Sequence, residues 1–202
     1  MPAQYGGRLS SVLDIAMKDG NLKKIEVEGG LGLIASRLSI QGPLKKEKAS
    51  FIISARRTYI DALVKPFVKK NSSFYGSGYY FYDMNTKVNY KVSDKDRLYL
   101  SGYFGRDVFD FKNNQRSFSA NIPWGNATAT VRWNHLFHQK LFTNTTLVFN
   151  NYNFAFNANQ NNLAFNVSSG IRDLTAKFDM DYYPNPQHKM RWGLQYTYHT
   201  FK

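Results

Sequence analysis

Apolar and polar residues alternate along most of the chain after residue 20. Such runs begin near Ile25, Leu38, Phe51, Val88, Leu98, Val131, Leu147, Phe178 and Met190. A period of two is typical of β-strands with one apolar and one polar face. The pattern predicts an all-β, antiparallel chain of eight or nine strands. The count depends on whether Gly29-Gly30-Leu31-Gly32 is a tight turn that splits the first run into a hairpin.

The lengths of the runs and of their connections favour strands that cross a membrane. The runs at residues 80–92, 127–137, 141–153 and 189–201 exceed the ~9–11 residues that a tilted membrane strand needs. Short turns are expected near residues 42–47, 93–96, 137–140 and 184–187, and long connections near 57–78, 107–125 and 154–173. Short turns on one side and long loops on the other are typical of bacterial outer-membrane barrels.

The composition agrees with strands that have one apolar and one solvent-exposed face. The chain has 14 Tyr, 16 Phe and 3 Trp, yet its mean hydropathy is -0.49. No run approaches the ~18 apolar residues of a membrane-spanning helix, which excludes a helical membrane protein. There is no cysteine, so neither disulfides nor a zinc-thiolate site is expected. Met1 is not followed by a secretory signal, so we expect that an exported protein has lost its beginning.

The net charge of +13 raises nucleic acid as a partner, but the basic residues are dispersed. Tight clusters occur only at Lys45-Lys46-Glu47-Lys48 and Lys69-Lys70. A phosphate-binding surface concentrates its basic residues on one face. We therefore predict no nucleic-acid binding, and attribute the excess to a positively lined barrel interior or to contact with anionic lipid.

No cluster of residues predicts catalysis, a cofactor or a metal. His135 and His138 are three apart and point to opposite sides of a strand, so they are a poor metal pair. Asp179 and Asp181 share a strand face, but Lys177 on that face predicts ion pairing rather than acid-base work.

Two further motifs also lack a chemical assignment. Gly29-Gly30-Leu31-Gly32 is not followed by Gly-Lys-Ser/Thr, and no Ser-His-Asp or nucleophile-elbow pattern is present, so the chain is not expected to be an enzyme. Residues 56–61 lie where a strand enters a long loop, and their Arg and Tyr side chains are candidates for contact with ligand or lipopolysaccharide. A solvated strand end is the simpler interpretation. The ligand remains unknown at this stage.

The first residues carry a family resemblance. The segment Tyr5-Gly6-Gly7-Arg8-Leu9-Ser10-Ser11-Val12-Leu13-Asp14-Ile15 resembles the final plug strand of TonB-dependent outer-membrane receptors, with Tyr5, Gly6, Gly7, Arg8 and Ser10 as its motif. Residues 17–21 would be the hinge into the barrel. The resemblance implies the end of the plug domain at residues 1–19 and the N-terminal part of a barrel of about 22 strands at 20–202.

The resemblance also implies a location and partners. The parent receptor would take up a nutrient across the bacterial outer membrane with energy from TonB. Its partners would be outer-membrane lipid and lipopolysaccharide, TonB through the missing N-terminal part, and in some cases a surface lipoprotein. Most of the plug and more than half of the strands would be missing, so this chain alone should not transport anything.

Two other hypotheses remain open from the sequence. A small stand-alone outer-membrane barrel, acting as a passive pore or structural protein, needs an even number of strands, with residues 1–19 outside or plugging the lumen. A soluble β-rich binding protein needs the faces that carry Trp133, Phe149 and Trp192 to be buried in a sandwich core.

Overall fold

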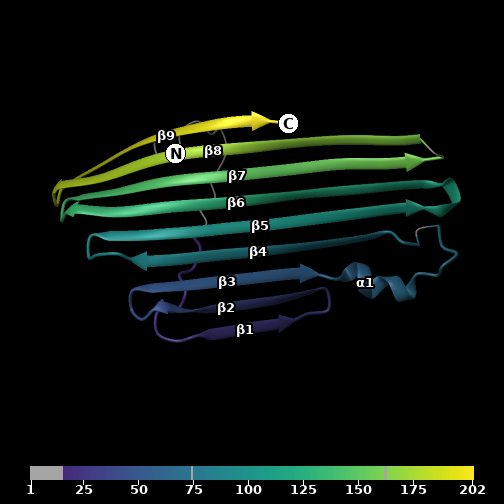
Figure 1. Cartoon of the computed structure of the whole chain (residues 1–202), viewed down its shortest axis with the longest axis horizontal. Helices are drawn as coiled ribbons and strands as arrows, with labels where there is room; N and C mark the ends of the chain where they lie inside the picture. The colour runs from purple at the N-terminus through teal and green to yellow at the C-terminus, as the bar shows by residue number, and fades with distance from the viewer. Residues whose placement is uncertain (1–15, 74, 162) are drawn as a thin grey trace.

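The chain forms one antiparallel sheet in which the strands lie side by side in sequence order (Figure 1). This computed structural model describes residues 16–73, 75–161 and 163–202. The nine strands are β1 (Glu26–Leu31), β2 (Ala35–Lys45), β3 (Ala49–Thr58), β4 (Gly78–Lys91), β5 (Asp96–Asn113), β6 (Phe118–His138), β7 (Leu141–Gln160), β8 (Leu163–Asn185) and β9 (His188–Phe201). The all-β, antiparallel prediction is confirmed, and β1 ends within the Gly29–Gly32 motif, which gives the higher strand count.

The turns at one end of the sheet are short, as the sequence predicts. They join β2 to β3, β4 to β5, β6 to β7 and β8 to β9. At the other end, one connection is long and holds the helix α1 (Ile60–Val64) and the 3₁₀ turn η2 (Lys65–Phe67). No helix within the described ranges is long and apolar enough to cross a membrane.

Two of the three predicted long connections are built of strand instead. β5 and β6 stay paired as far as Asn113 and Phe118, joined by the 3₁₀ turn η3 (Asn114–Arg116), and β7 and β8 stay paired as far as Gln160 and Leu163. The prediction of loops at 107–125 and 154–173 is therefore wrong. Both hairpins extend well past the run of alternating residues, and backbone pairing holds them together where the apolar pattern has faded.

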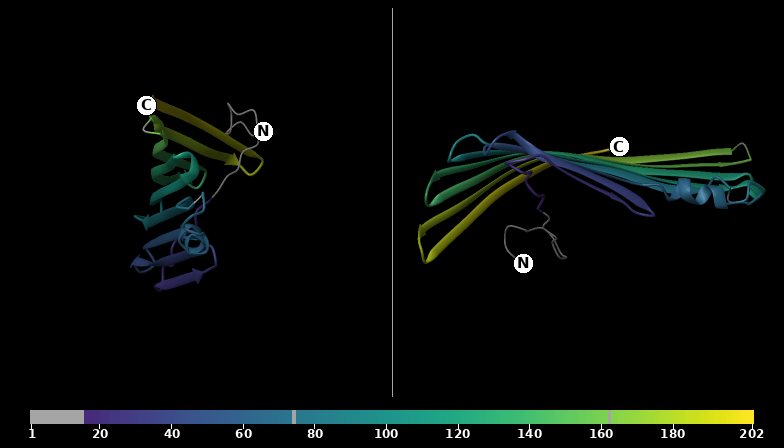
Figure 2. Two further views of the ribbon diagram at one scale, coloured as in Figure 1. Left: turned by 90° about the vertical axis from the view of Figure 1, so that its right-hand side faces the viewer. Right: turned by 90° about the horizontal axis from the view of Figure 1, so that it is seen from below.

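The sheet has no second layer within the described part of the chain (Figure 2). Trp133, Phe149 and Trp192 are 43%, 39% and 60% exposed. A sandwich core would bury these rings, so the soluble sandwich hypothesis is wrong for this structure. The sheet is also unclosed, because β1 and β9 each pair with one neighbour only.

Candidate functional site

The two faces of the sheet differ in chemistry. One side, which we call the polar face, carries Gln41, Ser54, Lys87, Thr128 and Thr175. Neighbouring strands are linked across this side by side-chain hydrogen bonds, at Gln41–Glu26, Ser39–Ser54, Asn89–Ser50, Thr128–Asn150 and Thr175–Thr197. Such cross-strand pairs fix the register of a sheet whose polar side has no apolar packing.

Ion pairs add to this network on the polar face. Arg56 Nη2 lies 2.7 Å from Asp83 Oδ2, and Lys177 Nζ lies 3.2 Å from Asp179 Oδ2. Asp181 is buried and pairs with Arg191 at 2.5 Å. The predicted ion pairing of Asp179 and Asp181 is confirmed, and it includes a second cation, Arg191, that the sequence interpretation had not named.

The segment before β1 is attached to the polar face. Lys87 Nζ on β4 donates a hydrogen bond to the carbonyl oxygen of Met17 at 2.8 Å and lies 2.7 Å from Asp19 Oδ1. Its ammonium also lies 5.3 Å from the centre of the Tyr99 ring. Ala16, Met17 and Asp19, together with side chains of β4, β5 and β6, line an open pocket of about 380 Å³. The segment predicted as a hinge, residues 17–21, thus contacts the polar face through Met17 and Asp19.

Gly20 makes the closest approach of this segment to the sheet. A Cβ atom at Gly20 would lie 2.0 Å from the carbonyl oxygen of Phe51. Backbone and backbone meet here without room for a side chain. The segment therefore needs glycine at this position to reach β1.

The opposite side of the sheet is an apolar face. It carries Val27, Ile40, Ile53, Val88, Leu98, Leu100, Val131, Leu147, Leu174, Phe178 and Leu194, most of which are exposed. Leu100, Leu147 and Leu174 are each more than half exposed. An apolar patch that crosses nine strands needs a partner that is itself apolar.

The apolar residues of this face form a band, which runs obliquely across the strands. In the row that pairs Asp96, His135, Thr143, Met180 and Trp192, the residues change from polar on β5–β7 to apolar on β8–β9. In the row that pairs Phe104, Ala127, Asn151, Arg172 and Thr200, the change runs the other way. The strands are thus inclined to the direction in which the band runs.

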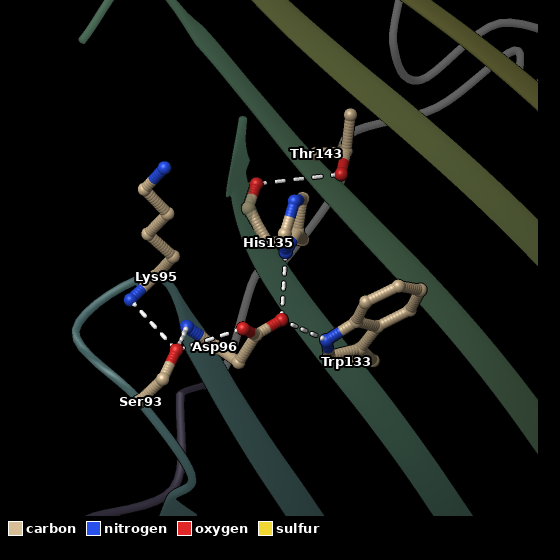
Figure 3. A network of polar contacts seen from close by, with 6 residues as sticks. All are labelled: Ser93, Lys95, Asp96, Trp133, His135 and Thr143. Atoms are coloured by element: carbon tan, nitrogen blue, oxygen red, sulfur yellow. Dashed lines mark hydrogen bonds and ion pairs between the residues drawn. The ribbon is translucent and has the colours of Figure 1, made fainter. Parts of the chain in front are cut away.

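A polar cluster borders the band at its short-turn end (Figure 3). Asp96 Oδ1 lies 2.6 Å from His135 Nδ1 and accepts a hydrogen bond from Trp133 Nε1 at 3.0 Å. Ser93 Oγ donates to the other carboxylate oxygen at 2.8 Å. The Thr143 hydroxyl donates to the backbone oxygen of His135 and not to its ring, so among the described residues no hydroxyl is hydrogen-bonded to this imidazole as a nucleophile would be.

The turn beside this cluster carries a second acidic residue. Asp94 is 94% exposed and lies 2.6 Å from Lys91 Nζ. The hydrogen bond from Lys91 lowers the pKa of Asp94. Asp94 and Asp96 are thus close in sequence but have very different surroundings.

The remaining sequence candidates have structural contacts or lie outside the described residues. The plug motif lies outside the described residues; it comprises Tyr5, Gly6, Gly7, Arg8 and Ser10. His135 binds Asp96, whereas His138 accepts a hydrogen bond from the Lys140 backbone. Across the residues that the structure describes, no group of three or more His, Asp or Glu could hold a metal ion. Arg56 pairs with Asp83, and Arg57 lies on the opposite face.

Sequence reasoning missed the Lys87–Asp19 contact and the Asp96–His135–Trp133 cluster. Lys87 bonds to Met17, 70 positions earlier, as well as to Asp19, and Asp96 bonds to residues 37 and 39 positions later. The register of β5 and β6 creates the Asp96 cluster, whereas the Lys87–Asp19 contact depends on the path of the segment before β1 over the polar face. Only the Asp96 cluster could have been suspected from the sequence, because Asp96 is a polar residue at the end of an otherwise apolar strand face.

Known proteins were compared at the level of sequence and of structure. No protein-family model matches the chain, and no curated protein matches it significantly. Among solved structures, the ferric yersiniabactin uptake receptor FyuA from Yersinia pestis superposes with a TM-score of 0.57 over 88% of this chain, at 14% sequence identity. The sheet matches part of a TonB-dependent receptor barrel. The likeness is one of fold, and the matched region covers 33% of that receptor.

The receptor-barrel fold accounts for the shape of the sheet. A barrel wall is a single layer of antiparallel strands with an outer and an inner face. An unclosed sheet with one apolar and one polar side corresponds to a sector of such a wall.

Proposed function

We propose that the chain is a sector of a TonB-dependent receptor in the bacterial outer membrane. Residues 1–19 are the end of the plug domain and residues 20–202 are the first barrel strands. The parent receptor takes up a nutrient across the membrane with energy from TonB. The observation that carries this proposal is the attachment of residues 16–19 to the polar face, opposite the exposed apolar band.

The dimensions of the apolar band support a membrane location. On β5 the apolar side chains of this face lie between Asp96 and Arg106. Ten steps of about 3.3 Å give about 33 Å along the strand, or about 25 Å at a tilt of about 40°. Outer-membrane barrels have an apolar band of about that height. The oblique course of the band across the register has the same cause, because tilted strands cross a level membrane at successive heights.

The polar face supports an inner, water-facing role. A barrel interior is polar, and its ion pairs and hydrogen bonds replace the core of a soluble protein. Segment 16–19 lies on this side, where a plug must lie. The short turns are then periplasmic, and the extended β5–β6 and β7–β8 hairpins project outside the cell.

The sheet edges support a larger parent barrel. β9 has Leu194, Tyr196 and Phe201 between 66% and 74% exposed, and its outer edge has no paired strand within the described residues. An open strand edge within hydrocarbon leaves backbone groups unsatisfied, so further strands must cover β1 and β9. Nine strands do not match the even number of a stand-alone bacterial barrel, and no observation favours the passive-pore hypothesis.

The proposed partners follow from this placement. Outer-membrane lipid and lipopolysaccharide would contact the apolar face, TonB would bind a segment before residue 1, and a surface lipoprotein would meet the projecting hairpins. The proposal assigns no enzyme activity to the chain.

The gene itself tests the proposal. The reading frame on both sides of this segment should encode a signal and plug upstream and about thirteen further membrane strands downstream. A start codon at Met1 and a stop codon after Lys202 would contradict it.

A further inference from the structure

Three arginines lie on the apolar face at the border of the band, on the side of the projecting hairpins. They are Arg57 on β3, Arg106 on β5 and Arg172 on β8, and all three are exposed. The register places Arg57 and Arg106 in one row, on either side of Tyr82. Two strand spacings of about 4.8 Å separate their backbones by about 10 Å.

These arginines have no acidic partner among the described residues, in contrast to the polar face. Arg56, next to Arg57 in sequence, forms an ion pair with Asp83 on the polar face. Arg57 instead lies 5.9 Å from the centre of the Tyr80 ring, so its side chain extends away from the band. The carboxylate of Asp110, four residues beyond Arg106, accepts a hydrogen bond from Asn121. Among the described residues, the three border arginines therefore form no ion pair, and the nearest carboxylate of this face on β5, Asp110, lies four residues beyond Arg106.

A groove lies next to this charge on the same face. It has a volume of about 910 Å³, and its apolar lining includes Leu38, Ala55, Met84 and Phe104. Arg57 and Tyr82 also line it, as do the ion-paired Arg56 and Asp83, whereas Arg106 lies beside Phe104 outside the lining. Ala55 lies between Leu38 and Met84 in the register, so a small side chain forms the floor and two large ones form the walls. The apolar side chains of this groove suit a hydrocarbon chain.

We infer that Arg57 and Arg106 bind the phosphate of an acidic membrane lipid, one acyl chain of which occupies the groove over Ala55. Guanidinium groups bind phosphate oxygens through paired, charge-assisted hydrogen bonds. A phosphate at the band's border lies at the depth of a lipid headgroup, and the groove runs from there into the band. Charge complementarity and the continuity of groove and border select a lipid over free phosphate. This inference rests on the proposed membrane location and adds a selective lipid site to it.

The test uses the full chain folded in micelles of a zwitterionic detergent and native mass spectrometry. The probes are dipalmitoyl phosphatidic acid and dipalmitoyl phosphatidylcholine, which share acyl chains and differ in net charge. The wild-type chain should bind phosphatidic acid preferentially, and the double variant Arg57→Gln with Arg106→Gln should lose about tenfold in affinity for it. The double variant Arg97→Gln with Arg132→Gln, an equal change of charge on the polar face, should bind as the wild type does.

A second substitution tests the groove, and inorganic phosphate tests the source of the phosphate. Ala55→Leu fills the floor and should weaken phosphatidic acid binding while leaving both arginines in place. Inorganic phosphate at the same concentration should not displace the lipid. Unchanged lipid binding by the double variant Arg57→Gln with Arg106→Gln, or equal competition by inorganic phosphate, would overturn the inference.

A control separates this inference from the proposed function. A fluorescent label at Leu100→Cys reports whether the apolar face contacts the micelle. Contact together with unselective lipid binding refutes the lipid site alone. A water-exposed label refutes the membrane location and the lipid site with it.

Discussion

Lys87 on β4 bonds to Asp19 at 2.7 Å and joins the segment before β1 to the polar face of the sheet. The Lys87 side chain is 16% exposed and that of Asp19 is 45% exposed. Since water screens the aspartate, the pair alone contributes about 1 kcal/mol or less. The hydrogen bond from Lys87 to the Met17 carbonyl makes the contact more specific than a surface ion pair.

Loss of this contact should free the segment without unfolding the sheet. We expect Lys87→Met to expose the peptide bond after Lys18 to trypsin and to raise its cleavage rate several-fold, because local opening becomes easier. Lys91→Met, which removes the partner of the exposed Asp94, is the matched control and should leave this rate unchanged. Equal cleavage rates in Lys87→Met and the wild type would contradict the attachment.

Gly20 should tolerate no side chain. A Cβ atom at this position would meet the Phe51 carbonyl oxygen, so Gly20→Ala should destabilise the folded chain by about 1–3 kcal/mol, as overpacking does. Gly29→Ala is the control, because its Cβ atom would meet only Leu38 Cδ1, at 3.9 Å. Urea unfolding in micelles measures both, and similar midpoints for the two variants would refute the close packing.

The two faces should respond differently to a new charge. Leu100→Arg places a cation at mid-height of the apolar band and should cost about 2–4 kcal/mol of folding free energy in a bilayer. Ser101→Arg, one residue later on the polar face, should cost less than about 1 kcal/mol. Unfolding from phosphatidylcholine vesicles measures the difference, and a larger cost at Ser101 than at Leu100 would reverse our assignment of the faces.

The Asp96 cluster should stabilise the short-turn end of the sheet. Asp96→Ala leaves Trp133 Nε1 and His135 Nδ1 without their carboxylate, and should lower the urea midpoint of unfolding. Asp94→Ala, in the same turn but almost fully exposed, should have little effect. Urea midpoints in micelles compare the two variants. A cluster without structural importance would give equal midpoints.

The strands could be predicted from the sequence because apolar and polar residues alternate along each strand according to the face on which they lie. The alternation at Leu98–Phe104 and at Met190–Tyr198 needs no knowledge of the neighbours. The prediction of loops at 107–125 and 154–173 failed because alternation ends where the hairpins leave the apolar band. At Pro123, which has no N–H to donate, the β6–β7 pairing is interrupted between Asn121 and Trp124.

Contacts between distant positions could not be predicted from the sequence. The alignment of Arg57 with Arg106 across Tyr82 depends on the register of successive strands. The pairing of Lys87 with Asp19 depends on the path of the segment before β1. A shift of one residue would turn every side chain of a strand to the other face. The chemistry of single residues was readable, but their partners were not.

Cysteine labelling along β5 tests the central claim most directly, and the chain has no native cysteine to interfere. Single cysteines at the positions 98–104 would carry a polarity-sensitive fluorophore in phosphatidylcholine bilayers. The account predicts lipid contact at Leu98, Leu100, Gly102 and Phe104, and water contact at Tyr99, Ser101 and Tyr103. Water contact at all seven positions, or no alternation between them, would contradict a membrane-facing band.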